Sequence, residues 1–253
     1  LNLNSKFIVP ISAKNGDNIQ KKSKKMSWYK GLSVIKILDD LDYHKNLDKK
    51  NLRLVVQDVY KKSDKRIVVG RIYTGKLRSG DQITISPSES LTKIKSFESW
   101  PESSKEIAKS GECVSFTLED DIFVQRGQII SKLAFAPKLL NCFEGNIFWL
   151  DDDDVDQKKT YTIKIGTGIY SVKFEEIKQI YEIDKTTKKL KTSIAKNDIA
   201  RVIFSSNALM PADSFSENIF TGRFSILSEE RVVGGGIISS IDYPNQRKTK
   251  NQQ

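Results

Sequence analysis

The sequence predicts a mainly β protein with two consecutive small antiparallel β-barrels, preceded by a short α/β segment. Beyond residue 51, short runs rich in β-branched and aromatic residues are separated by Gly, Asp, Ser or Pro at intervals of roughly 8–12 residues. These runs form two sets of six, and six short strands are enough to close a small barrel. A length of 253 residues also suits two or three compact units.

The strand runs can be placed in order along the chain. The first barrel is expected from residues 52–60, 67–74, 82–86, 91–99, 113–118 and 128–133. The second is expected from residues 146–150, 160–165, 169–183, 199–205, 222–227 and 232–241. The alternation of residues 169–183 shifts near Glu175 and Glu176, which predicts a bulge. Hairpin turns are expected at 80–81, 166–168 and 184–188.

The first 50 residues have a different texture. Residues 7–11 (FIVPI) predict a short buried strand, Asp17 and Asn18 are candidate helix caps, and residues 30–41 have the apolar spacing of an amphipathic helix. Residues 42–51 are polar and predict a linker. The expected boundaries are 1–48 for the α/β segment, 49–135 and 136–244 for the barrels, and 245–253 for a disordered basic tail.

Composition excludes several classes of protein. The sequence has no apolar run of about 18 residues, so no membrane span is expected. Cys113 and Cys142 match neither a disulfide framework nor a zinc spacing, which favours a reducing, cytoplasmic location. Of the net charge of +10, the first 50 residues carry +6. The absence of an initial Met and of a signal-peptide pattern suggests a piece of a longer chain.

The residues offer little catalytic chemistry, and no catalytic residue and no metal site are expected. The single histidine, His44, has no neighbouring nucleophile, and no phosphate-binding P-loop pattern occurs. The acidic run 151–154 lacks a calcium-loop pattern and is expected to be an exposed loop. Gly234, Gly235 and Gly236 are expected to let two backbones approach closely inside a strand. The chain therefore resembles a binding or scaffolding portion rather than a complete catalyst.

Several segments together resemble the translational GTPases of the elongation factor Tu type. Residues 7–19 (FIVPISAKNGDNI) resemble the end of their nucleotide-binding domain, and Trp28-Tyr29-Lys30-Gly31 resembles the helix that follows. Residues 69–81 (VGRIYTGKLRSGD) resemble the signature of their second domain, with turn residues at fixed offsets. The two barrels would then be the second and third domains of such a protein, after a remnant of its GTP-binding domain.

Within that superfamily, residues 117–127 (TLEDDIFVQRG) are similar to the large, GTP-binding subunit of sulfate adenylyltransferase (CysN type). Residues 147–149, 161–164, 220–222 and 233–238 are also similar to that subunit. Phe123 and Gln125 depart from its pattern, where residues are usually smaller or acidic. Residues 220–224 (FTGRF) also fit eukaryotic and archaeal elongation factors and their release-factor relatives.

The resemblance implies specific contacts. Ser12, Ala13 and Lys14 would touch guanine, with GTP and Mg²⁺ held by the parent protein and no cofactor by this piece alone. The expected partners are the protein's own GTPase domain and a small ATP-binding subunit that makes adenosine 5′-phosphosulfate. Nucleic acid is less expected, and no membrane is expected. Contacts to these partners are expected at eight residues: Gly75, Lys76, Gly80, Asp81, Glu119, Asp120, Asp121 and Arg126.

Three alternatives remain at this stage. The eight residues could merely close turns of the barrel, since Gly and Asp at turns need no further reason. The chain could belong to a translation factor, whose barrels bind tRNA or the ribosome. It could also be a non-catalytic binding module, because one fold serves many functions. A fused kinase domain beyond residue 253 and the order of residues 1–48 are left open, although a strand and helix without their sheet should expose apolar surface.

Overall fold

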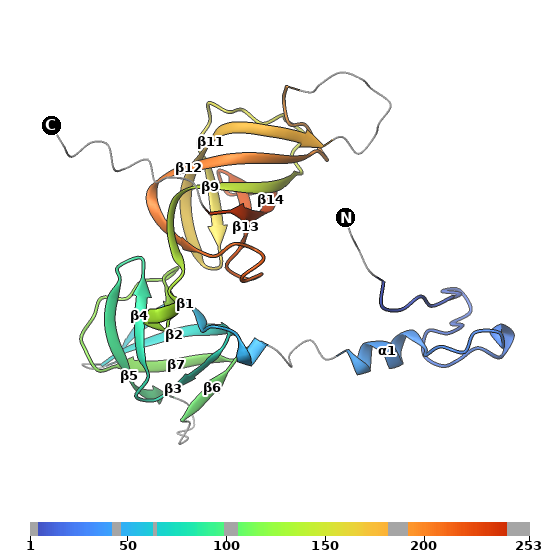
Figure 1. Cartoon of the computed structure of the whole chain (residues 1–253), viewed down its shortest axis with the longest axis horizontal. Helices are drawn as coiled ribbons and strands as arrows, with labels where there is room; N and C mark the ends of the chain where they lie inside the picture. Colours follow the sequence, from blue (N-terminus) through green and yellow to red (C-terminus); the bar gives the residue numbers. More distant parts are fainter. Residues whose placement is uncertain (1–4, 42–46, 63–64, 99–105, 182–191, 242–253) are drawn as a thin grey trace. The chain divides into compact units, whose positions relative to one another are not determined.

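The computed structural model describes the chain except for residues 1–4, 42–46, 63–64, 99–105, 182–191 and 242–253 (Figure 1). The chain divides into two compact units, residues 1–46 and 47–253. The predicted turn at 184–188, the tail 245–253 and His44 lie outside the described residues. No helix among the described residues is long and apolar enough to cross a membrane.

The first unit contains short helices, η1 (Lys24–Met26) and α1 (Val34–Asp40), and an isolated bridge between Ser12 and Asp17. The strand predicted at 7–11 is wrong: these residues form no ladder, and Phe7 and Ile8 are 55% and 80% exposed. A strand needs a neighbour for its backbone groups, and the described part of this unit supplies only the one bridge. The helix is shorter than the predicted 30–41. The exposed apolar surface expected of this segment is confirmed at Phe7, Ile8 and the outer face of α1.

The predicted helix caps are also wrong. Asp17 and Asn18 start no helix; Asn18 instead has a left-handed backbone, with φ 58°, and a buried side chain. Ser23 caps η1, with its side chain accepting a hydrogen bond from the Lys25 backbone. The residue before α1 is Ser33, whose hydroxyl donates to the Gln20 carbonyl rather than capping the helix.

The first barrel is closed and antiparallel, with strand order β1-β2-β7-β5-β4-β8. Its strands confirm the six predicted runs to within a few residues: β1 (Arg53–Lys62), β2 (Lys65–Thr74), β4 (Gln82–Ser86), β5 (Ser90–Glu98), β7 (Cys113–Leu118) and β8 (Ile129–Ser131). The pair β3 (Lys76–Arg78) and β6 (Ile107–Lys109) was not predicted, because a three-residue run carries too little alternation. The short helices η2 (Leu47–Lys49) and η3 (Leu133–Phe135) lie before and after this barrel.

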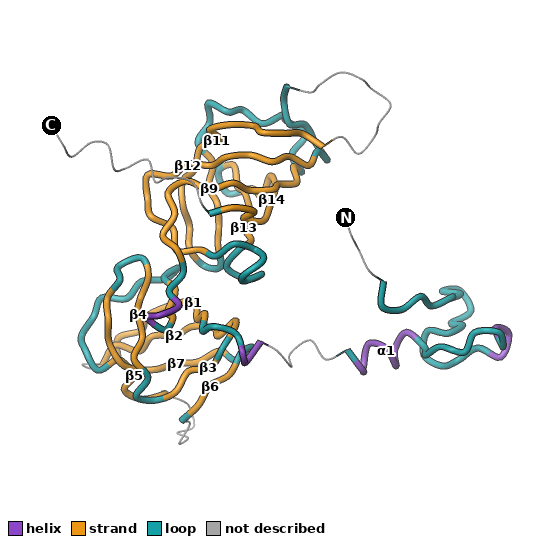
Figure 2. Tube along the Cα trace, viewed as in Figure 1, coloured by secondary structure: helices purple, strands orange, loops and turns teal. Residues whose placement is uncertain are grey.

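The second barrel is also closed, with strand order β10-β11-β12-β9-β14-β13. Its strands are β9 (Lys138–Trp149), β10 (Tyr161–Ile165), β11 (Gly168–Tyr181), β12 (Ile199–Ala212), β13 (Arg223–Ser228) and β14 (Arg231–Ser240). Strands make up most of both barrels in Figure 2. The predicted bulge is confirmed by a register shift between Phe174 and Glu176. β9 and β12 are longer than predicted, because they pair again beyond a polar irregularity between Ser205 and Met210.

The predicted close approach at the glycine run is confirmed. A Cβ added to Gly236 would lie 2.5 Å from the Asn146 carbonyl oxygen, and one added to Gly234 would lie 2.8 Å from that of Phe148. β14 therefore pairs with β9 so closely that there is no room for side chains at these two positions. The turn at 166–168 is also confirmed, since Ile165 pairs with Gly168 across it.

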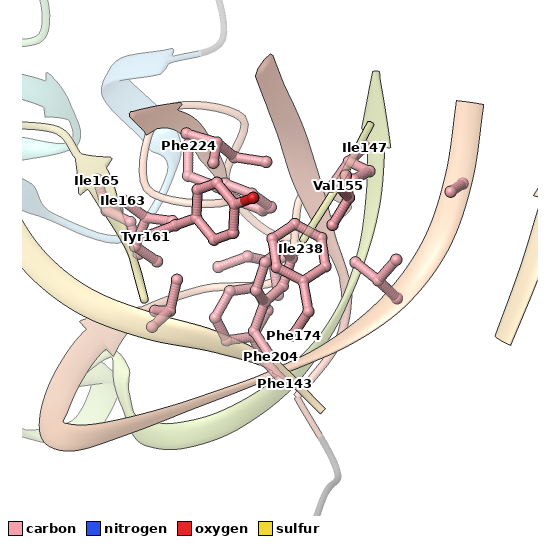
Figure 3. Packing of buried hydrophobic residues seen from close by; sticks show 14 of the residues in the cluster. Phe143, Ile147, Val155, Tyr161, Ile163, Ile165, Phe174, Phe204, Phe224 and Ile238 are labelled. Carbon is pink, nitrogen blue, oxygen red and sulfur yellow. The ribbon is translucent and has the colours of Figure 1, made fainter. Parts of the chain in front are cut away.

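Aromatic rings fill the core of the second barrel (Figure 3). Phe204 is fully buried, and its ring centroid lies 4.7 Å from that of Phe174, 5.2 Å from Phe143 and 5.5 Å from Phe224. The first barrel has its own separate core of aliphatic residues around Phe116. Each barrel thus excludes water independently, and the contact between them must be stabilised by other groups.

Tyr170 on β11 gives the second barrel a testable response to alkali. Burial raises the pKa of Tyr170 to about 12, so the folded protein favours the neutral phenol. The stability that the neutral Tyr170 phenol contributes should be complete below about pH 9, where an unfolded tyrosine is still neutral, and should fall by roughly 2–3 kcal/mol by pH 12. Urea unfolding across this range should show a steeper loss in the wild type than in Tyr170→Phe. Parallel losses in the two proteins would contradict the assignment.

Candidate functional site

The motif that resembles a guanine contact lies in a tight turn of the first unit. Ser12 and Asp17 exchange two backbone hydrogen bonds, of 3.3 and 3.2 Å, and close the turn. Ala13 and Lys14 lie at its exposed tip, and Gly16 has a positive φ of 71°. The turn therefore presents a lysine stem and peptide N–H groups to solvent, which are groups that could cover a planar base and donate to its oxygen.

Asn18 stabilises this turn through hydrogen bonds from its side chain and its backbone. Its amide donates to the Pro10 carbonyl at 2.9 Å, and its side-chain oxygen accepts from the Ser23 backbone at 2.8 Å. Its own carbonyl accepts from the backbone of Val34 at 3.0 Å, which ties the start of α1 to the turn. Asn18 was predicted only as a helix cap, so its role in holding the motif is a finding of the structure.

The turn at 75–81 in the first barrel has clear structural causes. Gly75 and Gly80 both have a positive φ of 79°, and a Cβ on Gly75 would lie 2.6 Å from the Leu52 Cα atom. The Asp81 carboxylate accepts from the Arg78 backbone at 2.7 Å and pairs with Lys132 at 2.7 Å. Lys76 is exposed and lies 3.9 Å from the Asp48 carboxylate. Gly75, Gly80 and Asp81 thus shape the turn for structural reasons, and Lys76 and Gly80 are the two of the four residues that are exposed.

The second predicted segment, 119–126, borders a groove of about 290 Å³ at one end of the first barrel. Glu119 and Asp120 are exposed, and Asp120 accepts a 2.8 Å hydrogen bond from the Thr92 hydroxyl. Asp121 lies 3.4 Å from the Arg66 guanidinium, which also stands 5.8 Å from the ring centroid of the exposed Phe123. The groove therefore mixes acidic and basic side chains, and the exposed Phe123 ring lies beside Arg66, one of its lining residues.

The structure brings the two predicted segments to one strand. The backbone N–H of Ile94 on β5 donates to the Asp81 carbonyl at 3.0 Å, and the carbonyl of the preceding residue, Lys93, accepts from the Glu119 backbone at 3.0 Å. Arg126 lies further along, where its guanidinium donates to the Gln57 carbonyl at 2.6 Å. Ser12, Ala13 and Lys14 belong to the other unit.

Sequence reasoning missed a buried polar network between the barrels. Arg53 of β1 donates to the Asp213 carboxylate through Nε at 2.7 Å and Nη2 at 2.6 Å, and both side chains are only 6–7% exposed. Arg53 also donates to the carbonyls of Leu52 and Phe135, and the Thr221 hydroxyl donates to Asp213. Such a paired fork satisfies two buried charges that would be costly alone. The signal in the sequence was weak, because the run that contains Arg53 also contains Asp58, and Asp213 lies outside the predicted strand runs.

Further hydrogen bonds join the same surfaces. The Asn218 amide donates to the Thr74 hydroxyl at 3.0 Å, and the Thr167 hydroxyl donates to the Val56 carbonyl at 2.6 Å. Gly127 is needed here, because its φ is +92° and a Cβ would lie 2.7 Å from the Gly168 Cα atom. The loop that borders the groove therefore ends against a turn of the second barrel.

The acidic run 151–154 is not simply the exposed loop that was predicted. Asp151 is 8% exposed and its carboxylate pairs with Arg231 at 2.8 Å. Asp152 remains exposed, and hydrogen bonding and charge from Lys196 hold its pKa below the usual value. Among the described residues no group of three or more metal-ligating side chains occurs, and Cys113 and Cys142 are free thiols.

Comparison with known proteins supports the expected resemblance. Residues 142–239 match the family model described as GTP-eEF1A C-terminal domain-like. The chain is 29% identical over 251 residues to sulfate adenylyltransferase subunit 1 of Sulfurovum sp., covering 95% of the chain and 52% of that protein. It is 30% identical over 234 residues to sulfate adenylyltransferase subunit 1 of Colwellia psychrerythraea, covering 91% of the chain and 50% of that protein.

Solved structures agree on the fold. The crystal structure of Sup35 complexed with GDP matches with a TM-score of 0.72 at 17% identity, covering 92% of the chain and 58% of Sup35. The Sup35 complex with GMPPNP matches with a TM-score of 0.71. The predicted fold class and the predicted resemblance are thereby confirmed. The chain spans about half the length of the curated relatives that it matches.

Proposed function

We propose that this chain is the barrel-bearing part of the GTPase subunit of a sulfate adenylyltransferase. The main support for this proposal is that at least nine-tenths of the chain is similar to sulfate adenylyltransferase subunit 1 of several organisms. In this proposal residues 1–48 end a GTP-binding domain, and 49–135 and 136–244 are the two barrel domains. The parent protein acts in the cytoplasm and couples GTP hydrolysis to synthesis of adenosine 5′-phosphosulfate from ATP and sulfate.

The turn at Ser12–Lys14 fits one part of a GTP site. Its exposed N–H groups and lysine stem suit a guanine base, and Asn18 holds the turn in shape. The sequence contains no P-loop to hold phosphates or Mg²⁺, so those contacts are assigned to the part of the parent protein outside this chain. The contribution of these residues is to bind and orient the base.

The barrels serve in this proposal as a rigid frame that docks the small ATP-binding subunit. Two features support a rigid frame: the buried Arg53–Asp213 pair, and the close backbone approach at Gly127. Lys76 and the exposed side chains of Glu119, Asp120, Asp121 and Arg126 are proposed to contact the partner or the GTPase domain. A frame that moves as one body could transmit the state of the nucleotide to the partner.

The test is association of the purified chain with the small subunit from the same source. Analytical ultracentrifugation should detect a complex of equal stoichiometry. The Asp121→Ala and Lys76→Ala variants should weaken the complex if the proposed contacts are right, while Lys173→Ala, at an exposed lysine on β11 of the second barrel, should not. If the wild-type chain does not associate, the proposed docking function is wrong.

A translation factor is the second candidate, and the eEF1A-like family model together with the Sup35 fold favours it. Its barrels would bind tRNA or the ribosome. Such binding should fall steeply as salt rises, because phosphate contacts release counterions. Filter binding of tRNA at low and moderate salt distinguishes the two functions: tight, salt-sensitive retention would favour the translation factor over sulfate activation.

A further inference from the structure

A hollow of about 500 Å³ opens where the two barrels meet. The first barrel contributes Tyr73, near the end of β2. The second barrel contributes Lys164 from β10 and Arg223 and Ser225 from β13, and β14 adds Gly236. Ser225 has a small side chain and Gly236 has none, so the surface between the larger lining residues is recessed. A ligand seated here would touch both barrels at once.

An aromatic stack forms one wall of this hollow. The rings of Tyr73 and Phe220 stack with centroids 4.9 Å apart and planes 28° apart. The Arg71 guanidinium stands 5.9 Å from the Tyr73 centroid, and the Arg223 guanidinium stands 5.6 Å from that of Phe220. Attraction to a ring face holds each guanidinium in place while leaving its N–H donors unused.

The two cations that line the hollow, Lys164 and Arg223, and the Arg71 guanidinium that stands against its aromatic wall have no carboxylate of their own. No described carboxylate forms an ion pair with Arg71, Lys164 or Arg223, and no acidic residue lines the hollow. Glu217 lies on the same loop as Phe220, but its carboxylate accepts from the backbone and hydroxyl of Ser214. By contrast, the buried Arg53 is paired with the Asp213 carboxylate.

The sheet fixes the spacing of two of these cations. Lys164 on β10 lies directly opposite Ser225 on β13, two residues beyond Arg223. Lys164 and Arg223 are therefore diagonal neighbours on one face, roughly 7 Å apart at their β-carbons. This spacing, together with the braced Arg71 across the stack, suits a ligand with two or three negative groups rather than a single ion.

We propose that this hollow docks an acidic segment of a protein partner, one that carries carboxylates beside an apolar or aromatic side chain. Charge complementarity supports an anionic ligand, and Tyr, Phe and Arg are enriched at protein–protein interfaces. Single-stranded nucleic acid needs open ring faces for base stacking, and here guanidiniums and the partner ring occupy them. The inference rests on the proposed function in one respect: the segment is assigned to the small subunit.

The experiment compares the wild-type chain with Arg71→Glu/Arg223→Glu. Binding to the purified small subunit is measured alongside binding to a fluorescein-labelled peptide of six glutamates and one phenylalanine. Charge reversal should weaken both by about 100-fold, since it replaces attraction by repulsion at two positions. Arg71→Gln/Arg223→Gln should weaken them less, and it preserves the test should the reversed variant fail to fold. Lys173→Glu, an exposed lysine on β11, is the matched control and should bind as the wild type does.

The outcomes separate the two proposals. If the small subunit binds the wild type and both double variants equally, the hollow is not its docking site, although the proposed function stands. If the small subunit does not bind the wild type at all, the proposed function fails, and the peptide then decides: loss of peptide binding in the variants supports the acidic-segment site, and unchanged binding overturns it. In a competition experiment, unlabelled peptide and a single-stranded oligonucleotide each displace the labelled peptide. If the oligonucleotide does so at the lower concentration, the inference is overturned in favour of nucleic acid.

Discussion

Truncation of Asp213 to alanine should destabilise the region of residues 47–253 by about 3–5 kcal/mol, the loss expected when one partner of a buried ion pair is removed. The reason is geometric. Arg53 would keep its charge in a site where it is only 7% exposed, while its two hydrogen bonds to the carboxylate would be lost. The Thr221 hydroxyl would lose its acceptor at the same time. Urea unfolding followed by circular dichroism measures the loss.

The same variant tests whether the pair couples the barrels. The wild-type barrels should unfold in one transition, and Asp213→Ala should separate it into two, because each barrel has its own core. Arg53→Met/Asp213→Leu should recover much of the lost stability, as apolar replacements of buried pairs often do. Asp121→Ala is the surface control: its pair with Arg66 is exposed and should contribute less than about 1 kcal/mol. A loss in Asp213→Ala no larger than this control would refute the argument.

The barrels could be predicted because the sequence pattern of each strand and turn lies within a few consecutive residues. Each strand carries its own alternation, and glycines such as Gly80 fall where the backbone needs a positive φ. The strand predicted at 7–11 failed for the complementary reason. Its apolar residues have the composition of a buried strand, but burial depends on a sheet that the described part of this unit does not contain.

The polar contacts between barrels could not be predicted, because their partners are far apart in the chain. Arg53 and Asp213 are separated by 160 positions, and Thr74 and Asn218 by 144. Alternation fixes which face of a strand a residue lies on, but it does not say which surface of another barrel will cover that face. For the same reason, the sequence did not predict the aromatic and cationic residues of the hollow between the barrels. Arg71 and Tyr73 precede Phe220 and Arg223 by about 150 residues.

The second large effect is expected in the core of the second barrel. Phe204→Ala should cost about 3–5 kcal/mol, the range typical of a buried phenylalanine replaced by alanine. Phe204 is fully buried and packs against Phe143, Phe174 and Phe224, which come from three other strands (Figure 3). The cavity would therefore lie where β9, β11 and β13 meet, and no single neighbouring strand could fill it. Thermal or urea unfolding measures the loss.

Phe148→Ala is the matched control, because Phe148 lies on β9 in the same barrel but is 37% exposed. It should cost much less than Phe204→Ala, since its ring already contacts water and leaves a smaller cavity. Trp149 lies in the second barrel's core, so its fluorescence should follow this transition. Because the Arg53–Asp213 pair is intact in Phe204→Ala and is expected to couple the barrels, the first barrel should unfold in the same, weakened transition. Equal losses in the two variants would mean that the rings of the cluster do not determine the stability of this barrel. A loss confined to the second barrel would instead mean that the Arg53–Asp213 pair does not join the barrels into one folding unit.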